Sequence, residues 1–250
     1  MRILLLSGKD VNSQIVLSFL LKNYNLIGLI EDIPVKKQKI ITKRMKRLGV
    51  LTTLSQLLFI TLVVPFLKLE SKKRKNQILE GHKLSDSNSL EIPSISCSIN
   101  DEQSINFANK LSPDVIVVNG TRIISSKFLE TVNCPIINIH VGITPKYRGV
   151  HGGYWALVNR DLLNLGVTVH LVDVGIDTGS VLIQKTVNIQ ANDNFITYPI
   201  LQTIKGLDCL DQILKSKNFT NVSGVISESK LYHHPTIFVY FKNRLLKGVK

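Results

Sequence analysis

Hydrophobic residues are arranged in two alternating patterns along this chain: short uninterrupted apolar runs, and longer segments in which apolar positions recur every three or four residues. The runs predict buried strands, and the longer amphipathic segments predict helices. Strands are expected at 2–7, 26–31, 114–119, 135–139, 166–172 and 181–189. Helices are expected at 12–22, 102–111, 125–131 and 196–216, and a late strand or extended tail at 231–241.

Strands and helices alternate through most of the chain, which is typical of a mostly parallel sheet with helices on both faces. The run Val-Ile-Val-Val at 115–118 suits a strand that is covered on both sides. We therefore expect a doubly wound α/β fold. Sheets of this kind bind ligands beyond the carboxyl ends of their strands, and polar loops follow Ser7, Asn119 and Ile139.

Residues 36–80 interrupt this alternation and are expected to form a basic and apolar helical insertion. The chain of 250 residues has 31 Lys+Arg and 18 Asp+Glu, a formal net charge of +13. Residues 36–75 contain twelve basic residues and one acidic residue, Glu70, so most of the net positive charge lies in this segment. The main α/β domain is expected to span 1–215, with 216–250 as an extension packed on it.

Twenty uncharged residues, 48–67, lie between the basic groups of the insertion, nominally enough to cross a membrane. Gly49 and Pro65 interrupt the run, and a span would separate the first strand from the rest of its sheet. Two interpretations remain open. The segment either packs on the protein or a second copy of the chain, or lies in a membrane interface, attracted by anionic lipid. Contact with nucleic acid is less favoured.

Two stretches hold the strongest candidate chemistry: Asn138-Ile-His140, and the Gly-rich turn 173–179, which carries Asp173 and Asp177. Positions 138 and 140 point the same way on a strand, so the amide and the imidazole emerge together. With a carboxylate from the turn they suit acyl transfer to an amine. The imidazole takes the amine proton, the carboxylate orients and charges the imidazole, and the amide donates to the oxyanion.

The first strand-to-helix loop, Ser7-Gly8-Lys9, matches neither the dinucleotide-binding fingerprint nor the P-loop of nucleotide-binding proteins. It either holds a phosphate at the helix N-terminus beside Lys9 or is a plain connection, and both interpretations stay open.

Metal chemistry is not favoured by the spacing of the candidate ligands. His233 and His234 are adjacent, so on a strand they would point apart, and we interpret them as structural. The three cysteines share no metal spacing and are too few for a disulfide framework, which favours a reducing, cytoplasmic location. They are Cys97, Cys134 and Cys209.

The motif Asn138-x-His140 with the downstream Pro145, followed by Asp177 in a Gly-rich turn, resembles the folate-dependent formyltransferase superfamily. That superfamily includes glycinamide ribonucleotide, methionyl-tRNA and sugar N-formyltransferases. The resemblance covers 100–190 well and the first 32 residues loosely. It implies a Rossmann-like formyltransferase fold, a catalytic triad of Asn138, His140 and Asp177, and 10-formyltetrahydrofolate as co-substrate without a metal.

The resemblance also implies where the two substrates lie. The pteridine would bind in an apolar slot between two loops. Its residues here are Gly120, Arg122, Ile123, Ile124, Val172, Asp173, Val174 and Gly175. The residues expected at the acceptor are Ser7, Gly8, Lys9, Tyr147, Arg148 and His151. Trp155 is interpreted as a core residue.

Three acceptors of the superfamily compete. Methionyl-tRNA formyltransferases have a further carboxy-terminal domain, whereas only residues 217–250 follow the closing helix here. Glycinamide ribonucleotide enzymes typically continue the motif with Pro-Ser-Leu-Leu-Pro, where this chain has Val-Gly-Ile-Thr-Pro at 141–145, and they have no such insertion. We therefore expect a small-molecule amine, a nucleotide-linked amino sugar for surface polysaccharide synthesis. Glycinamide ribonucleotide is the alternative.

A different class also stays open: an inactive module that binds lipid or nucleic acid through 36–75. The intact Asn138, His140 and Asp177 favour the enzyme. An anionic membrane surface is a candidate partner of 36–75, and a homodimer is compatible with the sequence.

Overall fold

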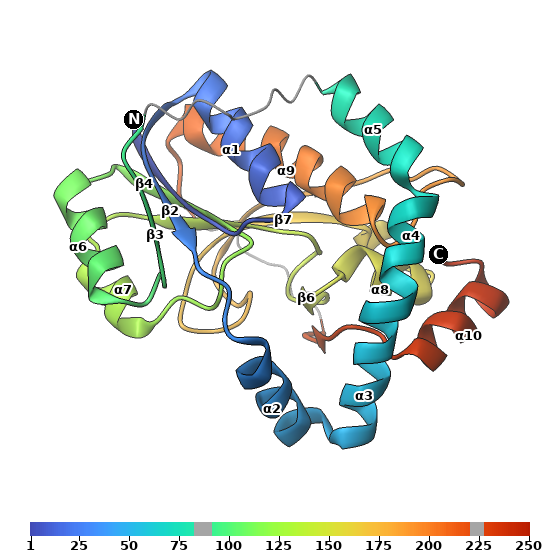
Figure 1. Ribbon diagram of the computed structural model, residues 1–250. Coiled ribbons are helices and arrows are strands. Elements are labelled where there is room, and N and C mark those ends of the chain that lie inside the picture. Colours follow the sequence, from blue (N-terminus) through green and yellow to red (C-terminus); the bar gives the residue numbers. More distant parts are fainter. Residues whose placement is uncertain (83–91, 221–227) are drawn as a thin grey trace.

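The computed structural model describes residues 1–82, 92–220 and 228–250 (Figure 1). A seven-stranded sheet, in the order β3-β2-β1-β4-β5-β7-β8, lies at its centre. The strands are β1 (Arg2–Ser7), β2 (Asn25–Asp32), β3 (Ser94–Cys97), β4 (Val115–Asn119), β5 (Ile136–His140), β7 (Gly166–Leu171) and β8 (Val181–Thr186). The strands from β3 to β5 are parallel, and β7 runs antiparallel to β5 and β8. The prediction of a mostly parallel α/β sheet is confirmed.

Helices pack on both faces of this sheet (Figure 1). One face is covered by α1 (Val11–Asn23) and α9 (Thr197–Ser216), and its core includes Ile137 and Ile139 of β5. The other face carries α6 (Glu102–Leu111) and α7 (Ser126–Thr131). Because side chains alternate along a strand, Asn138 and His140 point away from α9, toward the face that α6 and α7 partly cover.

The predicted elements are found with small shifts. The strand expected at 181–189 ends at Thr186. The elements that were not predicted include β3, whose Ser-Ile-Ser-Cys sequence has no apolar run, and α8 (Gly152–Val158), which begins with two glycines. A small second sheet pairs β6 (Arg148–Gly149) with β9 (Leu231–Tyr232).

The expectation of a late strand or extended tail at 231–241 was wrong beyond Tyr232, because a helix, α10 (Ile237–Lys247), begins there. Its N-cap is Thr236, whose hydroxyl accepts a hydrogen bond from the Val239 backbone N–H at 3.2 Å. Tyr240 on its inner side is fully buried. The helix therefore turns Tyr240 toward the core and leaves Phe238 exposed, whereas on a strand these two side chains would share one face. Residues 221–227 of the expected extension lie outside the described residues.

The predicted insertion is helical. It consists of α2 (Lys37–Leu48), α3 (Val50–Leu58), a π-helical turn (Phe59–Val63), α4 (Val64–Glu70) and α5 (Lys72–Gly81). In Figure 1 these helices run along one end of the sheet from α2, past α8 and α10, toward α9. The ring of Phe59 lies 5.1 Å from that of Phe195 and 5.0 Å from that of Tyr240. One face of the insertion is therefore part of a packed aromatic core.

The continuous helix Val50–Glu70 is long and apolar enough to cross a membrane, with a mean hydropathy of 2.1 and 28% of that stretch buried. Its place in the fold does not suit a span. β2 precedes it and β3 follows it, and these strands are neighbours in the sheet, with Ile30 paired to Ile95. Phe59 and Leu67 are fully buried against the domain. The helix therefore lies along the surface of the α/β domain.

Candidate active site

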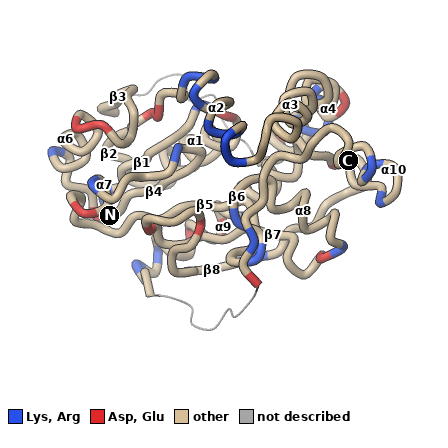
Figure 2. Tube along the Cα trace, turned by 90° about the horizontal axis from the view of Figure 1, so that it is seen from below, with Lys and Arg blue, Asp and Glu red and all other residues tan. Residues whose placement is uncertain are grey.

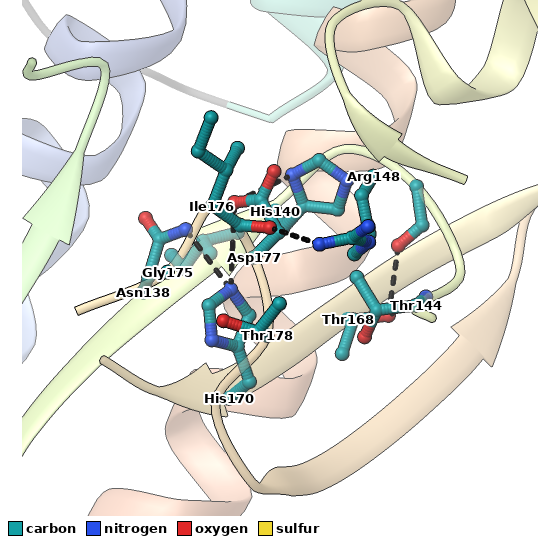
Figure 3. Close-up of polar contacts among 12 residues, drawn as sticks. Asn138, His140, Thr144, Arg148, Thr168, His170, Gly175, Ile176, Asp177 and Thr178 are labelled. Atoms are coloured by element: carbon teal, nitrogen blue, oxygen red, sulfur yellow. Dashed lines mark hydrogen bonds and ion pairs between the residues drawn. The ribbon is translucent and has the colours of Figure 1, made fainter. Parts of the chain in front are cut away.

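A cavity of about 570 Å³ lies beside the carboxyl ends of β1, β4 and β5. Its size falls in the range of about 300–1,000 Å³ that is typical of small-molecule sites. Apolar side chains such as Ile123 and Val172 form part of its wall. Its polar wall includes Asn138, His140, His170 and Asp177. These four polar residues, drawn in Figure 3, are the candidate catalytic cluster.

The antiparallel pairing of β5 and β7 sets the position of Asn138. In this register Asn138 lies opposite His170. His170 Nδ1 lies 2.7 Å from the Leu171 carbonyl, which only accepts, so Nδ1 carries a hydrogen and donates it. His170 Nε2 lies 3.2 Å from the Asn138 amide nitrogen and accepts a hydrogen bond from it. One N–H of Asn138 is thereby used to orient the amide, and the second N–H is left for a ligand.

His140, which is buried, is held by the backbone at one ring nitrogen. Its Nε2 lies 2.8 Å from the Tyr147 carbonyl oxygen, and because a carbonyl only accepts, Nε2 carries the hydrogen. The lone pair of the neutral ring is then on Nδ1, 3.4 Å from Oδ1 of Asp177. Burial lowers the pKa of His140 below its ordinary value, although Asp177 and the Tyr147 carbonyl oppose this effect. At neutral pH the ring is uncharged and able to accept a proton.

Asp177 is the only carboxylate of the candidate catalytic cluster. Oδ2 accepts a hydrogen bond from the Gly149 backbone N–H at 2.8 Å, and Oδ1 lies 3.8 Å from His170 Nε2. Burial alone would raise the pKa of Asp177, but His140, His170 and the Gly149 N–H outweigh it and hold the pKa below its usual range. The side chain is therefore an anion placed beside His140.

The turn between β7 and β8 presents this carboxylate. Asp173 accepts hydrogen bonds from the Gly175 N–H at 3.0 Å and from the Thr178 hydroxyl at 2.7 Å. A Cβ at Gly179 would lie 1.7 Å from the Leu171 carbonyl oxygen, so only glycine fits where the turn closes. Asp177 itself has a left-handed backbone, with φ of 51°. The tight turn thus directs Asp177 over the sheet toward His140.

Seven of the eight positions expected at the pteridine line the cavity. They are Gly120, Arg122, Ile123, Ile124, Val172, Asp173 and Gly175. Val174 points outward and is 69% exposed. The guanidinium of Arg122 donates to Asp32 at 2.8 Å and also to the Ile33 carbonyl, so its charge fixes the loop after β4.

The structure separates the residues expected at the acceptor. His151 lines the cavity. Arg148 donates to the Ile176 carbonyl at 3.1 Å and so supports the turn. The Tyr147 side chain is fully buried, and its hydroxyl donates to Asp161 at 2.8 Å. Its backbone carbonyl instead orients His140.

Ser7, Gly8 and Lys9 of the loop after β1 were expected at a phosphate, but in the structure they contact other parts of the protein. The Gly8 N–H donates to the Asn119 carbonyl at 3.0 Å, and the Ser7 hydroxyl donates to the Gly8 carbonyl. Lys9 forms an ion pair with Glu31 at 3.2 Å. These contacts do not bring the three residues into the cavity wall, which this loop reaches with Asp10 and Asn12.

His170 is the member of the candidate catalytic cluster that sequence reasoning did not assign. Its signal is the Thr168-x-His170 spacing on an apolar strand, but its role depends on the antiparallel register with β5. Two further polar atoms, Asn12 Oδ1 and Thr203 Oγ1, are buried in the cavity wall without a partner in the described part of the chain. They offer contacts to a ligand.

No group of three or more metal-ligating side chains occurs within residues 1–82, 92–220 and 228–250. Apolar side chains, several imidazoles and several carboxylates together line the cavity, and this mixture suits an organic ligand with a flat ring and polar substituents. This composition fits a folate.

The family model described as formyl transferase matches residues 70–199. Among curated proteins, the methionyl-tRNA formyltransferase of Thermodesulfovibrio yellowstonii is 34% identical over 111 residues, 44% of this chain and 36% of that protein. That of Clostridium tetani is 39% identical over 93 residues, 37% of this chain and 30% of that protein. The chain thus matches about a third of the length of these curated relatives.

Solved structures share the fold over a larger part of the chain. A sugar N-formyltransferase from Shewanella sp. aligns with a TM-score of 0.57 and 16% identity, covering 93% of this chain and 76% of that one. Phosphoribosylglycinamide formyltransferase from Streptococcus pneumoniae aligns with a TM-score of 0.53 and 18% identity, covering 88% and 98%. At these identities the likeness concerns the fold.

Proposed function

This chain belongs to the formyl transferase family, and we propose that it transfers the formyl group of 10-formyltetrahydrofolate to an amine. The observation that carries the proposal is the convergence of Asn138, His140 and Asp177 on one cavity wall, with His140 Nδ1 3.4 Å from Asp177. A neutral base beside a carboxylate, with an amide donor nearby, suits attack of an amine on an acyl carbon.

In the proposed reaction, each of the three groups has one task. The bond between the amine nitrogen and the formyl carbon forms, and negative charge develops on the formyl oxygen. The free N–H of Asn138 donates a hydrogen bond to that oxygen. Nδ1 of His140 takes the amine proton, and Asp177 stabilises the imidazolium. The imidazolium then gives this proton to the folate nitrogen as the bond between that nitrogen and the formyl carbon breaks, which would release the formylated amine and tetrahydrofolate. His170 holds the Asn138 amide in the orientation that this requires.

The loop after β4 and the turn before Asp177 would hold the pteridine. Ile123, Ile124 and Val172 supply apolar contacts, and the folate supplies the formyl group. Arg122 has its charge neutralised by Asp32, so it acts through the shape of the loop. The proposed pteridine site therefore contains all the residues expected there except Val174, which does not line the cavity.

We propose that the acceptor is a nucleotide-linked amino sugar. The curated relatives match only the part of the chain that carries the shared site, so their names do not decide between acceptors. The basic α2, which lies beside the cavity, suits a phosphorylated acceptor.

The test is a formyl-transfer assay with an acceptor panel. Purified protein and 10-formyltetrahydrofolate are incubated with nucleotide-linked amino sugars, glycinamide ribonucleotide and methionyl-tRNA, and the product mass is measured. Formylation of an amino sugar supports the proposal. Formylation of glycinamide ribonucleotide or methionyl-tRNA alone contradicts the acceptor, and no product with any amine contradicts the activity.

We also propose that the protein contacts an anionic membrane surface. The outward side of the helix Val50–Glu70 carries six large apolar residues at spacings of three and four, between 46% and 84% exposed. They are Leu51, Leu54, Leu58, Leu62, Phe66 and Leu69. α10 lies against α3 and adds exposed Phe238, Phe241, Leu245 and Leu246. We call these ten residues the α3–α10 face.

The charges around the α3–α10 face favour lipid as its occupant. The neighbouring α2 is rich in Lys and Arg (Figure 2), and so is α5. Apolar side chains flanked by cations are attracted to anionic headgroups and inserted at the interface. A second copy of the chain would bring two basic rims together, which is unfavourable. We therefore propose that the protein works in the cytoplasm, at a membrane surface.

A further inference from the structure

A second, smaller cavity of about 240 Å³ adjoins the proposed active site. It shares Val150 and His234 with the larger cavity, so the two cavities meet at these side chains. Its wall comes from α2, α3 and the segments around Val150 and His233. The residues are Lys43, Arg44, Arg47, Leu48, Gln56, Val150, His233 and His234, which we call the α2 cleft.

The α2 cleft is positively charged and has no acidic residue in its wall. Lys43, Arg44 and Arg47 lie on successive turns of α2, so they share one side of the helix. Arg44 is half-buried, and burial lowers the pKa of its guanidinium. No salt bridge is formed by these three side chains among the described residues. A half-buried cation without a counter-charge is costly, and a bound anion would remove that cost.

The positive field reaches the two histidines of the α2 cleft. Burial lowers the pKa of His233, and Arg47 and Arg44 lower it further. Burial and Arg44 lower the pKa of His234 to about 4. The same cations would attract a phosphate, which in turn would raise both histidine pKa values.

The insertion contributes α2 and α3 to the α2 cleft, and direct contacts connect these helices to the wall of the larger cavity. Gln56 of α3 donates a hydrogen bond to the His234 carbonyl at 2.7 Å. His234 in turn contacts His151 of the larger cavity through ring nitrogens 3.0 Å apart. The insertion, the α2 cleft and the proposed active site are therefore connected by direct contacts.

We propose that the α2 cleft binds a phosphate or diphosphate group of the acceptor, whose amine then reaches His140 in the larger cavity. This inference rests on the proposed function and names the part of the chain that selects a phosphorylated acceptor. Arginine guanidinium groups pair with phosphate oxygens in a bidentate manner, which suits Arg44 and Arg47.

The primary test measures binding of inorganic pyrophosphate and uridine diphosphate to the whole protein by calorimetry, without turnover. The double variant Arg44→Gln/Arg47→Gln should lose at least about tenfold in affinity for both. The matched control is Lys72→Gln/Lys73→Gln on α5, which removes the same charge from the same insertion outside the cleft. The control should change affinity less than about twofold. Equal losses in the two double variants, or no binding by wild type at millimolar ligand, would overturn the proposal.

Two further readouts keep the test independent of folding and of the proposed activity. Arg44→Lys, which retains the charge but not the bidentate geometry, should keep more of the affinity than Arg44→Gln and less than wild type. Pyrophosphate should raise the pKa values of His233 and His234 measured by NMR in wild type, but not in the arginine double variant. Binding in the cleft with no formylation of any amine would contradict the proposed function and leave the anion site standing. Formylation without cleft binding would contradict only the anion site.

A last arm separates the two sources of phosphate. Vesicles of phosphatidylglycerol and phosphatidylcholine are added to protein bound to pyrophosphate. Unchanged pyrophosphate affinity supports a soluble acceptor. Displacement of pyrophosphate by the anionic vesicles, but not by vesicles of phosphatidylcholine alone, would assign the cleft to lipid headgroups and overturn its role with the acceptor.

Discussion

His140 Nδ1 lies 3.4 Å from the carboxylate of Asp177, while a backbone carbonyl holds the other ring nitrogen. The imidazole therefore has a fixed tautomer, and a proton added to it arrives beside a negative charge. Burial and Asp177 act on the His140 pKa in opposite directions, and burial is the larger effect.

Replacing Asp177 by Asn should move the acid limb of the pH–rate profile to lower pH. Asp177 raises the pKa of His140, so without its charge burial lowers that pKa further. The maximal rate should also fall, by roughly a hundredfold, because the imidazolium is no longer stabilised. The measurement is kcat/KM for the formyl donor between pH 4.5 and 8. An acid limb that stays in place or moves upward would contradict the assigned pairing.

His170 is expected to act as a positioning residue for Asn138. His170→Ala should lower kcat by roughly tenfold or more, because the amide loses its acceptor and rotates. His170→Gln, which keeps an acceptor, should recover part of the rate. In a double-mutant cycle with Asn138→Ala, the two losses should be far from additive. Additive losses, or a fall in thermal stability at unchanged kcat, would show that His170 serves only the fold.

Asn138 and His140 could be predicted as a pair because strand alternation is a local feature, and the turn 173–179 could be predicted from its glycines. The choice of Asp177 within that turn follows from the resemblance to the formyltransferases. The role of His170 depends on which strand pairs with β5 and in which direction, and no local pattern specifies that register. Tyr147 was expected at the acceptor because it follows the motif, but the chain turns its ring into the aromatic cluster around Tyr232.

Helix α10 shows the same limit at the level of the fold. The sequence around Tyr240 and Phe241 is compatible with a strand as well as with a helix. The Thr236 cap and the burial of Tyr240 against the insertion decide for the helix. The insertion could be predicted as helical, but which of its faces is buried depends on Phe195 and Tyr240, which are distant in sequence.

The protein should lose stability as the pH falls from about 6.5 toward 4. His151 and His234 are buried as neutral rings, with the pKa of His151 well below its ordinary value and that of His234 lowered to about 4. The unfolded chain takes up protons near pH 6.5 that the folded protein excludes, so the free energy of unfolding decreases over this window. For His234 the loss should be on the order of 2 kcal/mol by pH 4.5.

The measurement is urea unfolding of wild type and His151→Phe/His234→Phe at pH 7 and 4.5. The double variant should show a clearly smaller difference between the two pH values. His82→Gln, a change at an exposed histidine, is the control and should behave like wild type. The same pH dependence in all three proteins would contradict the buried neutral state.

Membrane contact should depend on the α3–α10 face. Leu54→Gln/Leu58→Gln/Leu62→Gln should reduce binding to vesicles with 30% anionic lipid by roughly tenfold or more, because three exposed leucines no longer enter the interface. The control is Leu162→Gln/Leu163→Gln, two leucines exposed elsewhere on the surface. Raising the salt concentration should weaken binding of wild type.

Flotation of the vesicles gives the bound fraction, and sedimentation gives the oligomeric state. Unchanged vesicle binding by the triple variant contradicts membrane contact. A wild-type dimer that becomes monomeric in the triple variant would assign the α3–α10 face to a second copy of the chain.

The most direct test of the account is formyl transfer by His140→Ala. With 10-formyltetrahydrofolate and the acceptor found in the panel, tetrahydrofolate release and product mass are followed for wild type and variant, and folate affinity is measured separately. The account predicts a fall in kcat of roughly 100- to 10,000-fold, with folate affinity within a few-fold of wild type. Near-normal turnover by His140→Ala would contradict the assignment of His140 as the base.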